Sequence, residues 1–493
     1  MERHGHALKI NVNDNVAVAI RDITKGEEVF CVTAAEDIPR GHKISLTNIS
    51  KGFNIVKYGH PIGHATSDIN PGKHVHTHNI KTNLSGLLEY KYNPVAFDKT
   101  EPKEGTFNGY VRKNGTVGIR NEIWIINTVG CVNKIAERIA SIAHERYKDR
   151  VDGVYTFVHP YGCSQLGDDH AHTQAVLKNM VNHPNAGGVL VLGLGCENNN
   201  IPEFKKALGF WDDNRVKFLN TQDVADEIEA GLELADKLVL YAEQFKRQEV
   251  PISNLIVGLK CGGSDGFSGI TANPLVGRFS DDIIAHGGTS ILTEVPEMFG
   301  AETILMNRCV DEKVFGKTVS LINDFKEYFI RYGQEIYENP SPGNKDGGIS
   351  TLEDKSLGCT QKGGAGQVVD VLDYGDVVQK RGLNLLQGPG NDLVAVTNLM
   401  AAGAHIVLFT TGRGTPFGGA VPTVKISSNS QLAKNKANWI DFDAGPILED
   451  KTLDELSKDF FNYLIDVANG DIKAKNEIYG FREISIFKDG VTL

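Results

Sequence analysis

Apolar and polar residues follow two different patterns along the chain. From residue 7 to about 80, short alternating segments such as ALKIN, NVAVAI and HVHTHN are separated by turn residues, as in KGEE and INPGKH. This spacing predicts a small all-β module over residues 1–95. A polar stretch with scattered proline and no sustained period follows, and it predicts a linker over residues 96–106.

Beyond the linker, apolar runs alternate with stretches of helical period. EIWIINTV, VYTFVHP, GVLVLGL and VKFLN are each followed by such a stretch, which predicts an α/β domain with a parallel sheet over residues 107–248. The polar segment KRQEVPIS marks the next boundary. NLIVGLK, TSILTEV, LNLLQ, HIVLFTT and PTVKISS then predict a second parallel-sheet α/β domain over residues 249–493. The predicted fold class is therefore multidomain α/β with an N-terminal all-β module.

Length and charge narrow the range of functions. A chain of 493 residues exceeds the roughly 250 to 300 residues of a single core, which agrees with several domains. The net charge is −11 without a Lys/Arg-rich run, so neither nucleic acid nor an anionic membrane is an expected partner. No stretch approaches the ~20 apolar residues of a membrane span, and the sequence predicts a cytoplasmic protein.

Four of the seven cysteines follow predicted strands: Cys131, Cys163, Cys196 and Cys261. Ligands bind beyond the carboxyl ends of parallel strands, where these thiols would lie. One such cysteine would more often be a buried packing residue, but four at equivalent positions favour metal ligands. Thiolates suit zinc, iron or an iron–sulfur cluster. Oxygen and nitrogen ligands stand close by in the sequence at Asp168, Asp169, His170, His172, Glu197 and Asp265.

Histidines and glycine-rich segments supply two further candidate sites. His74, His76 and His78 alternate in HVHTHN, so they share one face if the segment is a strand, and they either bind a metal or form an exposed row. TGRGTPFGG and KGGAGQ combine flexible backbone with Arg413 and Lys362, which suits a carboxylate. Pro416 interrupts the expected helix start, so the first segment fits a dinucleotide fingerprint poorly.

Long motifs spread over the whole chain resemble one enzyme family. NDNVAVAIRDI, IPRGHKISL and GKHVHTHN resemble the N-terminal β-clip (SAF-type) domain of the altronate and galactarate dehydratases. GYVRKNGTVGIRN, GCSQLGDD, LKCGGSDGFSGITANPLVGRFSD, TEVPEMFGAE, KSLGCTQKGG and LFTTGRGTPFGG continue the resemblance. It implies three domains, the last a Rossmann-like variant that holds a metal. It also implies a hydro-lyase acting on a hexonic or hexaric acid with iron or manganese.

Dehydration of a 2,3-dihydroxy acid requires a base, cations and help for the leaving hydroxide. We expect Glu294, Glu297 or His170 to act as the base. Lys260, Lys362 and Arg413, with His76 and His78, are expected to bind the substrate. Metal ligation is assigned to Cys163, Cys196 and Cys261, with Cys131 as a fourth ligand. The expected metal is Fe²⁺, with Mn²⁺ as the alternative and an iron–sulfur cluster left open.

Other functions stay open at this point. A sulfolactate-type lyase on the same scaffold would use the same metal and cations. A non-catalytic sugar-acid sensor would need the β module and the glycine loops, but not the thiols. The expected partners are a small sugar acid and a second copy of the chain in a homodimer.

Overall fold

The N-terminal region of the protein consists of short strands. The structure is a computed structural model that describes residues 1–97 and 101–493. A five-stranded sheet has the order β1 (Glu2–His4), β2 (Ala7–Lys9), β3 (Val16–Ala19), β6 (Lys43–Ser45) and β9 (His74–Val75). The other strands form a three-stranded sheet and a hairpin: β10 (Ile80–Lys81), β8 (His60–Ala65) and β7 (Asn54–Lys57), then β4 (Glu28–Val29) and β5 (Val32–Thr33).

The middle region contains a four-stranded parallel sheet. Its order is β14 (Val154–Thr156), β13 (Glu122–Asn127), β15 (Ala186–Gly193) and β16 (Val216–Asn220). The helices are α1 (Asn133–Tyr147), α2 (Gly167–Asn182), α3 (Ile201–Leu208) and α4 (Glu227–Ala242). A small antiparallel sheet of β12 (Val117–Gly118), β11 (Thr106–Val111) and β17 (Arg247–Pro251) brings together the two ends of this region.

The C-terminal region is built on a seven-stranded parallel sheet. Its order is β20 (Val368–Leu372), β21 (Gly382–Leu386), β19 (Thr289–Leu292), β18 (Ile256–Cys261), β22 (Ile406–Thr411), β23 (Thr423–Ser427) and β24 (Phe442–Asp443). The helices are α5 (Ala272–Ala285), α6 (Glu302–Met306), α7 (Glu312–Arg331), α8 (Pro342–Asp346), α9 (Leu352–Cys359), α10 (Asp392–Ala401), α11 (Ser430–Asn435), α12 (Leu453–Asn469) and α13 (Lys475–Ile478).

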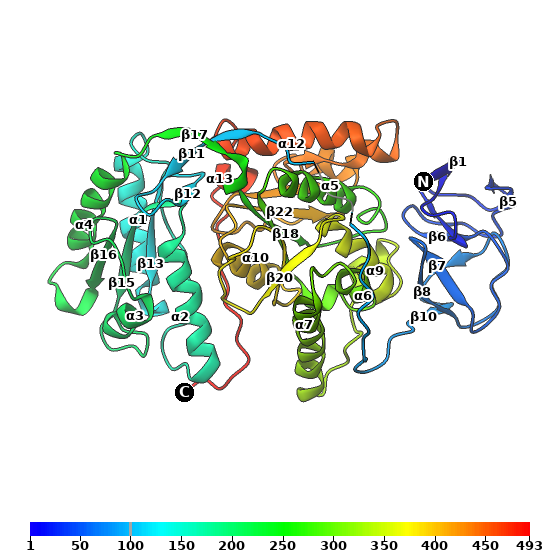
Figure 1. The fold of residues 1–493 in the computed structure, drawn as a ribbon, viewed down its shortest axis with the longest axis horizontal. Coiled ribbons are helices and arrows are strands. Elements are labelled where there is room, and N and C mark those ends of the chain that lie inside the picture. Colours follow the sequence, from blue (N-terminus) through cyan, green and yellow to red (C-terminus); the bar gives the residue numbers. More distant parts are fainter. Residues whose placement is uncertain (98–100) are drawn as a thin grey trace.

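The central strands of both parallel sheets are buried along their length. Every residue of β13, β15, β21 and β22 is buried, which explains why these segments are continuous apolar runs rather than alternating ones. The apolar cores of the two sheets are continuous, because α10 packs against α2 and their side chains belong to one cluster. The middle and C-terminal regions thus share a hydrophobic interface. Figure 1 shows α2 and α10 between the two sheets.

The N-terminal module docks on the C-terminal region at α9 (Figure 1). Lys43 and Lys57 reach across the interface to Asp354, at 2.8 Å and 2.9 Å. Thr351 donates a hydrogen bond to the carbonyl oxygen of Ile62 at 2.5 Å. Gly41 packs so closely on Gly347 that a Cβ there would lie 3.0 Å from the Gly347 carbonyl oxygen. The interface therefore combines buried charge with close backbone contact.

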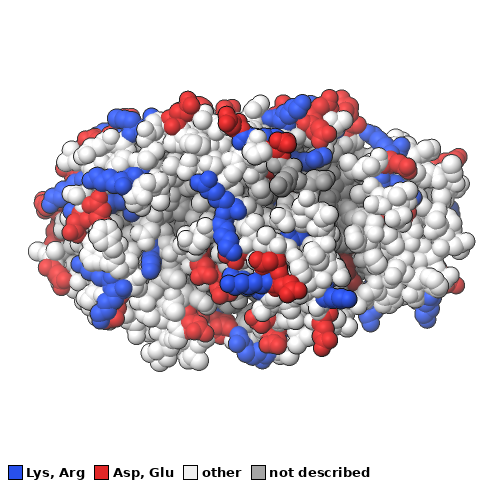
Figure 2. Space-filling view, viewed as in Figure 1, with Lys and Arg blue, Asp and Glu red and all other residues white. Residues whose placement is uncertain are grey.

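The expected combination of a β-rich N-terminal region and an α/β remainder with a parallel sheet in its C-terminal part is confirmed. Residues 98–100 of the expected linker lie outside the described residues, and the domain boundaries stay a prediction. Strands β20 and β24 were not expected from the sequence. In the described residues no helix combines the length and apolarity that crossing a membrane requires. Acidic and basic side chains are interspersed over the face in Figure 2.

Candidate active site

A network of buried charges lies at the carboxyl end of the seven-stranded sheet. Lys260 and Cys261 are the last two residues of β18, and Glu294 and Glu297 follow the adjacent strand β19. Lys362 comes from the 3-10 turn Thr360–Gly363 after α9. All five are fully or almost fully buried. Four of these expected residues meet because adjacent parallel strands end at the same edge of the sheet, and Lys362 joins them from the turn after α9.

Lys260 is the centre of the first half of this network. Its ammonium group forms an ion pair with Glu294 and lies 3.0 Å from an oxygen of Asp392. The other oxygen of Glu294 accepts a hydrogen bond from the backbone N–H of Cys261 at 2.9 Å and lies 3.6 Å from Lys362. Glu294 is thus held by two lysines and a backbone amide.

Cys261 is the centre of the second half. Lys362 Nζ donates to Cys261 Sγ at 3.0 Å, and the thiol lies 2.9 Å from an oxygen of Glu297. Cys359 Sγ is 3.4 Å away from the same sulfur. Lys355 pairs with the second oxygen of Glu297 at 2.8 Å. Cys261, Glu297 and Cys359 form one of the groups whose ligand atoms all lie within 4.8 Å of one another.

The pKa values of Glu294 and Glu297 are shifted in opposite directions. Burial and the neighbouring charge of Glu297 raise the pKa of Glu294, and these effects outweigh the two lysines. Burial would also raise the pKa of Glu297, but Lys355, Lys260 and Lys362 lower it well below its usual range. A pair of carboxyl groups with separated pKa values is the arrangement that acid–base catalysis uses.

The backbone of Glu294 is strained. Its φ of 73° and ψ of 62° lie in the left-handed region, which non-glycine residues rarely adopt. Such a conformation costs about 1 to 3 kcal/mol and is concentrated at functional sites. Here it ends β19 abruptly and turns the Glu294 carboxylate back toward β18, where Lys260 and the Cys261 amide bind it. The strained backbone conformation therefore places the Glu294 carboxylate within the charged network.

A glycine-rich loop, residues 387–391, covers the network. Lys260 donates to the carbonyl oxygen of Gly390 at 3.3 Å, and the backbone N–H of Val295 donates to that of Gly388 at 3.0 Å. A Cβ at Gly388 would lie 2.7 Å from Thr293 Oγ1, so only glycine permits this approach. The side chain of Asp392, next to the loop, is 31% exposed, whereas those of Lys260 and Glu294 are at most 1% exposed. Asp392 thus marks the solvent side of the network.

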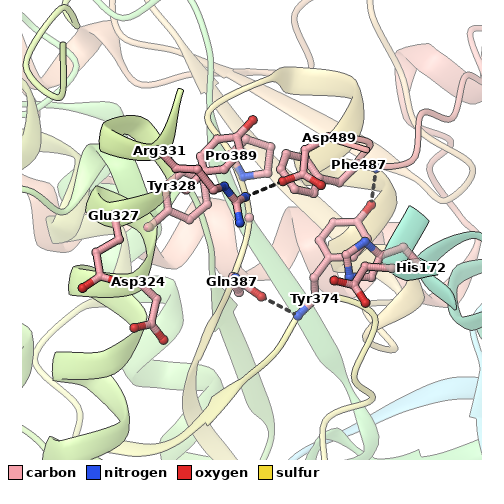
Figure 3. A pocket seen from close by; sticks show the side chains of 13 residues that line it. His172, Asp324, Glu327, Tyr328, Arg331, Tyr374, Gln387, Pro389, Phe487 and Asp489 are labelled. Atoms are coloured by element: carbon pink, nitrogen blue, oxygen red, sulfur yellow. Dashed lines mark hydrogen bonds and ion pairs between the residues drawn. The ribbon is translucent and has the colours of Figure 1, made fainter. Parts of the chain in front are cut away.

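The same loop forms one wall of a pocket of about 490 Å³ between the middle and C-terminal regions (Figure 3). The opposite walls come from α2, α7 and the C-terminal segment. Arg331 pairs with Asp489 at 2.6 Å, which leaves Asp168, Asp324 and Glu327 as further lining charges. Since these are acidic, the lining disfavours a carboxylate ligand. His172, one of the potential nitrogen ligands that follow Cys163 in the sequence, lines this pocket.

A second group of potential ligands lies where the N-terminal module meets α8. His42, His74 and His76 each offer a ring nitrogen within 4.8 Å of the others. His42 Nδ1 is 3.0 Å from His74 Nε2, and His42 Nε2 is 3.2 Å from the carbonyl oxygen of Asp346. Burial lowers the pKa of His74 to about 4 and that of His76 to about 3. The imidazoles are therefore neutral at neutral pH, the form that binds metals.

The remaining expected residues lie apart from the charged network. Arg413 is exposed, and its guanidinium donates to the carbonyl oxygen of Gly343 at 3.2 Å. His170 lies in the first turn of α2, in the middle region. His78 is exposed beside His74, with the ring centroids 5.3 Å apart. Strand β9 ends at Val75, so the expected alternation of three histidines along one strand is not what groups them.

The four strand-end cysteines are divided between two sheets. Cys261 is buried in the seven-stranded sheet, whereas Cys131, Cys163 and Cys196 are exposed on loops of the four-stranded sheet. The expected group of four thiols is therefore not assembled around Cys261. Among the described residues, neither group of ligand atoms within 4.8 Å contains Cys131, Cys163 or Cys196.

Three expected oxygen ligands have structural partners instead. Asp265 accepts hydrogen bonds from Ser268, Ser428 and Asn429. Glu197 accepts from Thr128 and from the backbone of its own loop. Asp169 accepts from the backbone N–H groups of Asp489 and Gly490.

Sequence reasoning did not find four residues of these groups: His42, Lys355, Cys359 and Asp392. Lys355 and Cys359 are both in α9, a helix that is buried on all sides and has no amphipathic period. Cys359 and Lys362 are three residues apart in KSLGCTQKGG, which was a usable signal. His42 faces His74 only because β6 pairs with β9, with Ile44 opposite His74.

Comparison with known proteins agrees with this architecture. Family models for the altronate/galactarate dehydratase SAF domain, the second domain and the C-terminal domain match residues 5–83, 109–243 and 252–492. The chain is 56% identical to altronate dehydratase of Bacillus subtilis (strain 168), with 99% of both chains covered. The chain belongs to the D-galactarate/altronate dehydratase family. The expected family and enzyme class, a hydro-lyase, are confirmed.

Two further relatives come from Escherichia coli (strain K12). The chain is 55% identical to altronate dehydratase, with 99% of both chains covered. It is 33% identical to galactarate dehydratase (L-threo-forming), with 97% of this chain and 96% of the relative covered.

Proposed function

We propose that the protein dehydrates D-altronate to 2-dehydro-3-deoxy-D-gluconate and water. The observation that carries the proposal is the identity of 56% and 55% to two altronate dehydratases over nearly the whole chain, against 33% to a galactarate dehydratase. The reaction removes a proton from C2 and hydroxide from C3. The resulting enol then takes up a proton at C3 and becomes the 2-keto acid, so one molecule of water is lost in total.

Glu294 is our candidate for the general base. Its raised pKa makes its carboxylate a stronger proton acceptor than an ordinary glutamate. Lys260 and Lys362 both lie beside it, and each is a donor for the negative charge that builds up next to the substrate carboxylate. Glu297 stays ionised beside three lysines and therefore fixes Lys355 and the Cys261 thiol in position.

The histidine group fits the iron or manganese that the family implies. Imidazole nitrogen suits iron. Nδ1 of His76 is buried and has no hydrogen-bond partner within residues 1–97 and 101–493. The Asp346 carbonyl oxygen accepts from Nε2–H of His42, which leaves Nδ1 as the ligand atom. By contrast, the sulfur and the carboxylate in the Cys261 group already have Lys362 and Lys355 as partners. A divalent ion bound by the histidines would polarise a substrate oxygen.

Helix α8 connects the two groups. The carbonyl oxygen of Asp346, its last residue, contacts His42, and the side-chain oxygen of Asn344 accepts from Lys355 at 3.1 Å. Lys355 in turn pairs with Glu297. This chain of contacts supports a reaction site between the N-terminal module and the C-terminal sheet, with Arg413 at its exposed edge.

The test is an anaerobic assay of the purified protein with Fe²⁺ against altronate, galactarate, glucarate and sulfolactate. The 2-keto-3-deoxy acid is measured after reaction with semicarbazide, and sulfite is measured for sulfolactate. We expect the highest kcat/KM with altronate. Preference for another sugar acid would show that this acid, rather than altronate, is the substrate. The absence of any keto acid would refute the proposal that the protein is a sugar-acid dehydratase. Glu338→Gln, which changes an exposed glutamate, is the control for Glu294→Gln.

A further inference from the structure

We propose that Cys131, Cys163 and Cys196 bind one [4Fe–4S] cluster through three thiolates. The three cysteines follow β13, β14 and β15, which are adjacent in the order β14-β13-β15. Because these strands are parallel, all three loops lie at one edge of the sheet. The inference concerns a cofactor of the middle region, and it does not depend on which sugar acid the protein dehydrates.

The exposure of these thiols argues against a packing role. Free cysteine is among the most buried residue types, yet all three are exposed, whereas Cys261, Cys309 and Cys359 are buried. Each of the three directly follows a glycine, in VGC, YGC and LGC. An odd number of exposed thiols on three separate loops suits a shared ligand better than a disulfide.

The loops pack on one another through those glycines. A Cβ at Gly130 would lie 2.6 Å from the carbonyl oxygen of His159, and one at Gly162 would lie 1.9 Å from that of Thr128. Gly162 has a φ of 98°, which L side chains rarely adopt. The backbone N–H of Asn199 donates to the carbonyl oxygen of Gly162 at 3.0 Å. These contacts hold the three cysteine loops together.

Two buried polar atoms beneath the same loops have no hydrogen-bond partner among the described residues. Asn127, the last residue of β13, has an unpartnered Oδ1, and Gln165, two residues after Cys163, has an unpartnered Nε2. Both residues are at most 4% exposed. Buried polar atoms normally have partners. The Gln165 Nε2–H group can donate to a cluster sulfide, whereas the Asn127 oxygen is itself an acceptor and needs a donor such as water.

The helices at this edge favour negative charge. Helices α1, α2 and α3 begin within a few residues of Cys131, Cys163 and Cys196, respectively, so three positive helix ends face the edge that carries the thiols (Figure 1). Thiolates and the sulfides of a cluster are negatively charged. The field of the helices therefore stabilises the ligand that the thiols suit.

The spacing of the thiols favours a cluster over a single ion. A tetrahedral ion with metal–sulfur bonds of ~2.3 Å holds its ligand atoms within about 4 Å of one another. In the described part of the chain, no group within 4.8 Å contains these three cysteines. A cubane binds each thiolate at a different iron, so it joins more widely separated sulfurs.

The experiment is anaerobic reconstitution of the full chain with ferric iron, sulfide and dithiothreitol, followed by desalting. We expect about four iron and about four sulfide ions per chain and the visible absorption of a [4Fe–4S] cluster. Cys131→Ser, Cys163→Ser and Cys196→Ser should each lose at least half of the iron and sulfide. Circular dichroism should be unchanged, because these side chains are exposed.

Cys31→Ser is the matched control, since Cys31 is a free, exposed cysteine of the N-terminal module. It should keep the full cluster, and so should Cys261→Ser. Bound iron without sulfide, which the histidine group alone would give, would overturn the proposal. A full cluster in any of the three variants, or no bound iron in the wild type, would also overturn it. Since the readout is iron and sulfide content, it is independent of success or failure in the altronate assay.

Discussion

Asp354 of α9 lies 2.8 Å from the ammonium group of Lys43, and neither side chain is exposed to solvent. Lys57 binds the other carboxylate oxygen at 2.9 Å. One buried carboxylate thus neutralises two lysines of the N-terminal module. Asp354→Asn would leave both cations buried beside an amide, which typically costs about 3 to 5 kcal/mol. We expect a clearly lower Tm and faster proteolysis of the N-terminal module in this variant.

Asp450→Asn is the control for this substitution, because Asp450 is exposed. It should change the free energy of unfolding by less than about 0.5 kcal/mol. If Asp354→Asn had the same Tm and the same proteolysis rate as Asp450→Asn, the ion pair would not hold the module in place.

The same carboxylate predicts how the interface responds to acid. Burial would raise the pKa of Asp354, but the charges of Lys43 and Lys57 lower it below the ordinary 3.8. A depressed carboxyl pKa stabilises the folded state fully above 3.8, and this contribution is lost as the pH falls toward the folded pKa. The Tm of the wild type should therefore fall more steeply below pH 4 than that of Asp354→Asn. Parallel curves would contradict this origin of acid sensitivity.

Mutation of the histidine group should remove a divalent metal without unfolding the protein. His42→Ala and His76→Ala each delete one imidazole from a set of three, and we expect at least a ten-fold weaker affinity for Fe²⁺ or Mn²⁺. Calorimetric titration with Mn²⁺ measures this directly. His60→Ala is the control, since His60 is an exposed histidine of the same module. Equal Mn²⁺ affinity in all three variants would refute metal binding by this group.

Much of the charged network could be predicted because the strand-end rule depends only on local sequence. Lys260, Cys261, Glu294 and Glu297 follow apolar runs directly, and adjacent parallel strands then bring them together. Lys355 and Asp392 could not be found in this way, since each comes from a helix whose position depends on tertiary packing. The rule did not separate Cys261 from the other three cysteines, because it applies within one parallel sheet and the described residues form two such sheets.

The histidine group shows the limit of reading one segment at a time. HVHTHN is a candidate by itself, but His42 lies 32 residues before His74, in IPRGHKISL, and no pattern within that segment singles it out. The antiparallel pairing of β6 with β9 joins the two. Single-sequence patterns contain no information on such pairing when strands are two or three residues long.

Arg413 allows a test of the carboxylate contact at the edge of the site. In the structure its guanidinium is exposed and donates only one hydrogen bond in the described residues, to Gly343. A surface cation of this kind contributes under about 1 kcal/mol, whereas a bidentate pair with a substrate carboxylate contributes about 2 to 5 kcal/mol. Arg413→Lys keeps the charge but loses the planar fork. We expect kcat/KM to fall roughly thirty-fold with Tm unchanged, and unchanged kinetics would exclude this contact.

Glu294 and Glu297 provide the sharpest test of the reaction site, because their pKa values are shifted in opposite directions. Glu294→Gln removes the proposed base while an amide oxygen can still accept from Lys260 and the Cys261 amide, so we expect kcat to fall by about 10² to 10⁴ with little change in KM. The pH dependence of any residual activity should lose its acid limb, since that limb reports ionisation of the base. Glu297→Gln leaves Lys355 without its buried partner, so it should instead lower the Tm substantially. Exchange of the C2 proton of altronate with solvent deuterium, followed by NMR, distinguishes proton abstraction from a structural role. This exchange should stop in Glu294→Gln. Continued exchange in that variant would assign proton abstraction to another residue.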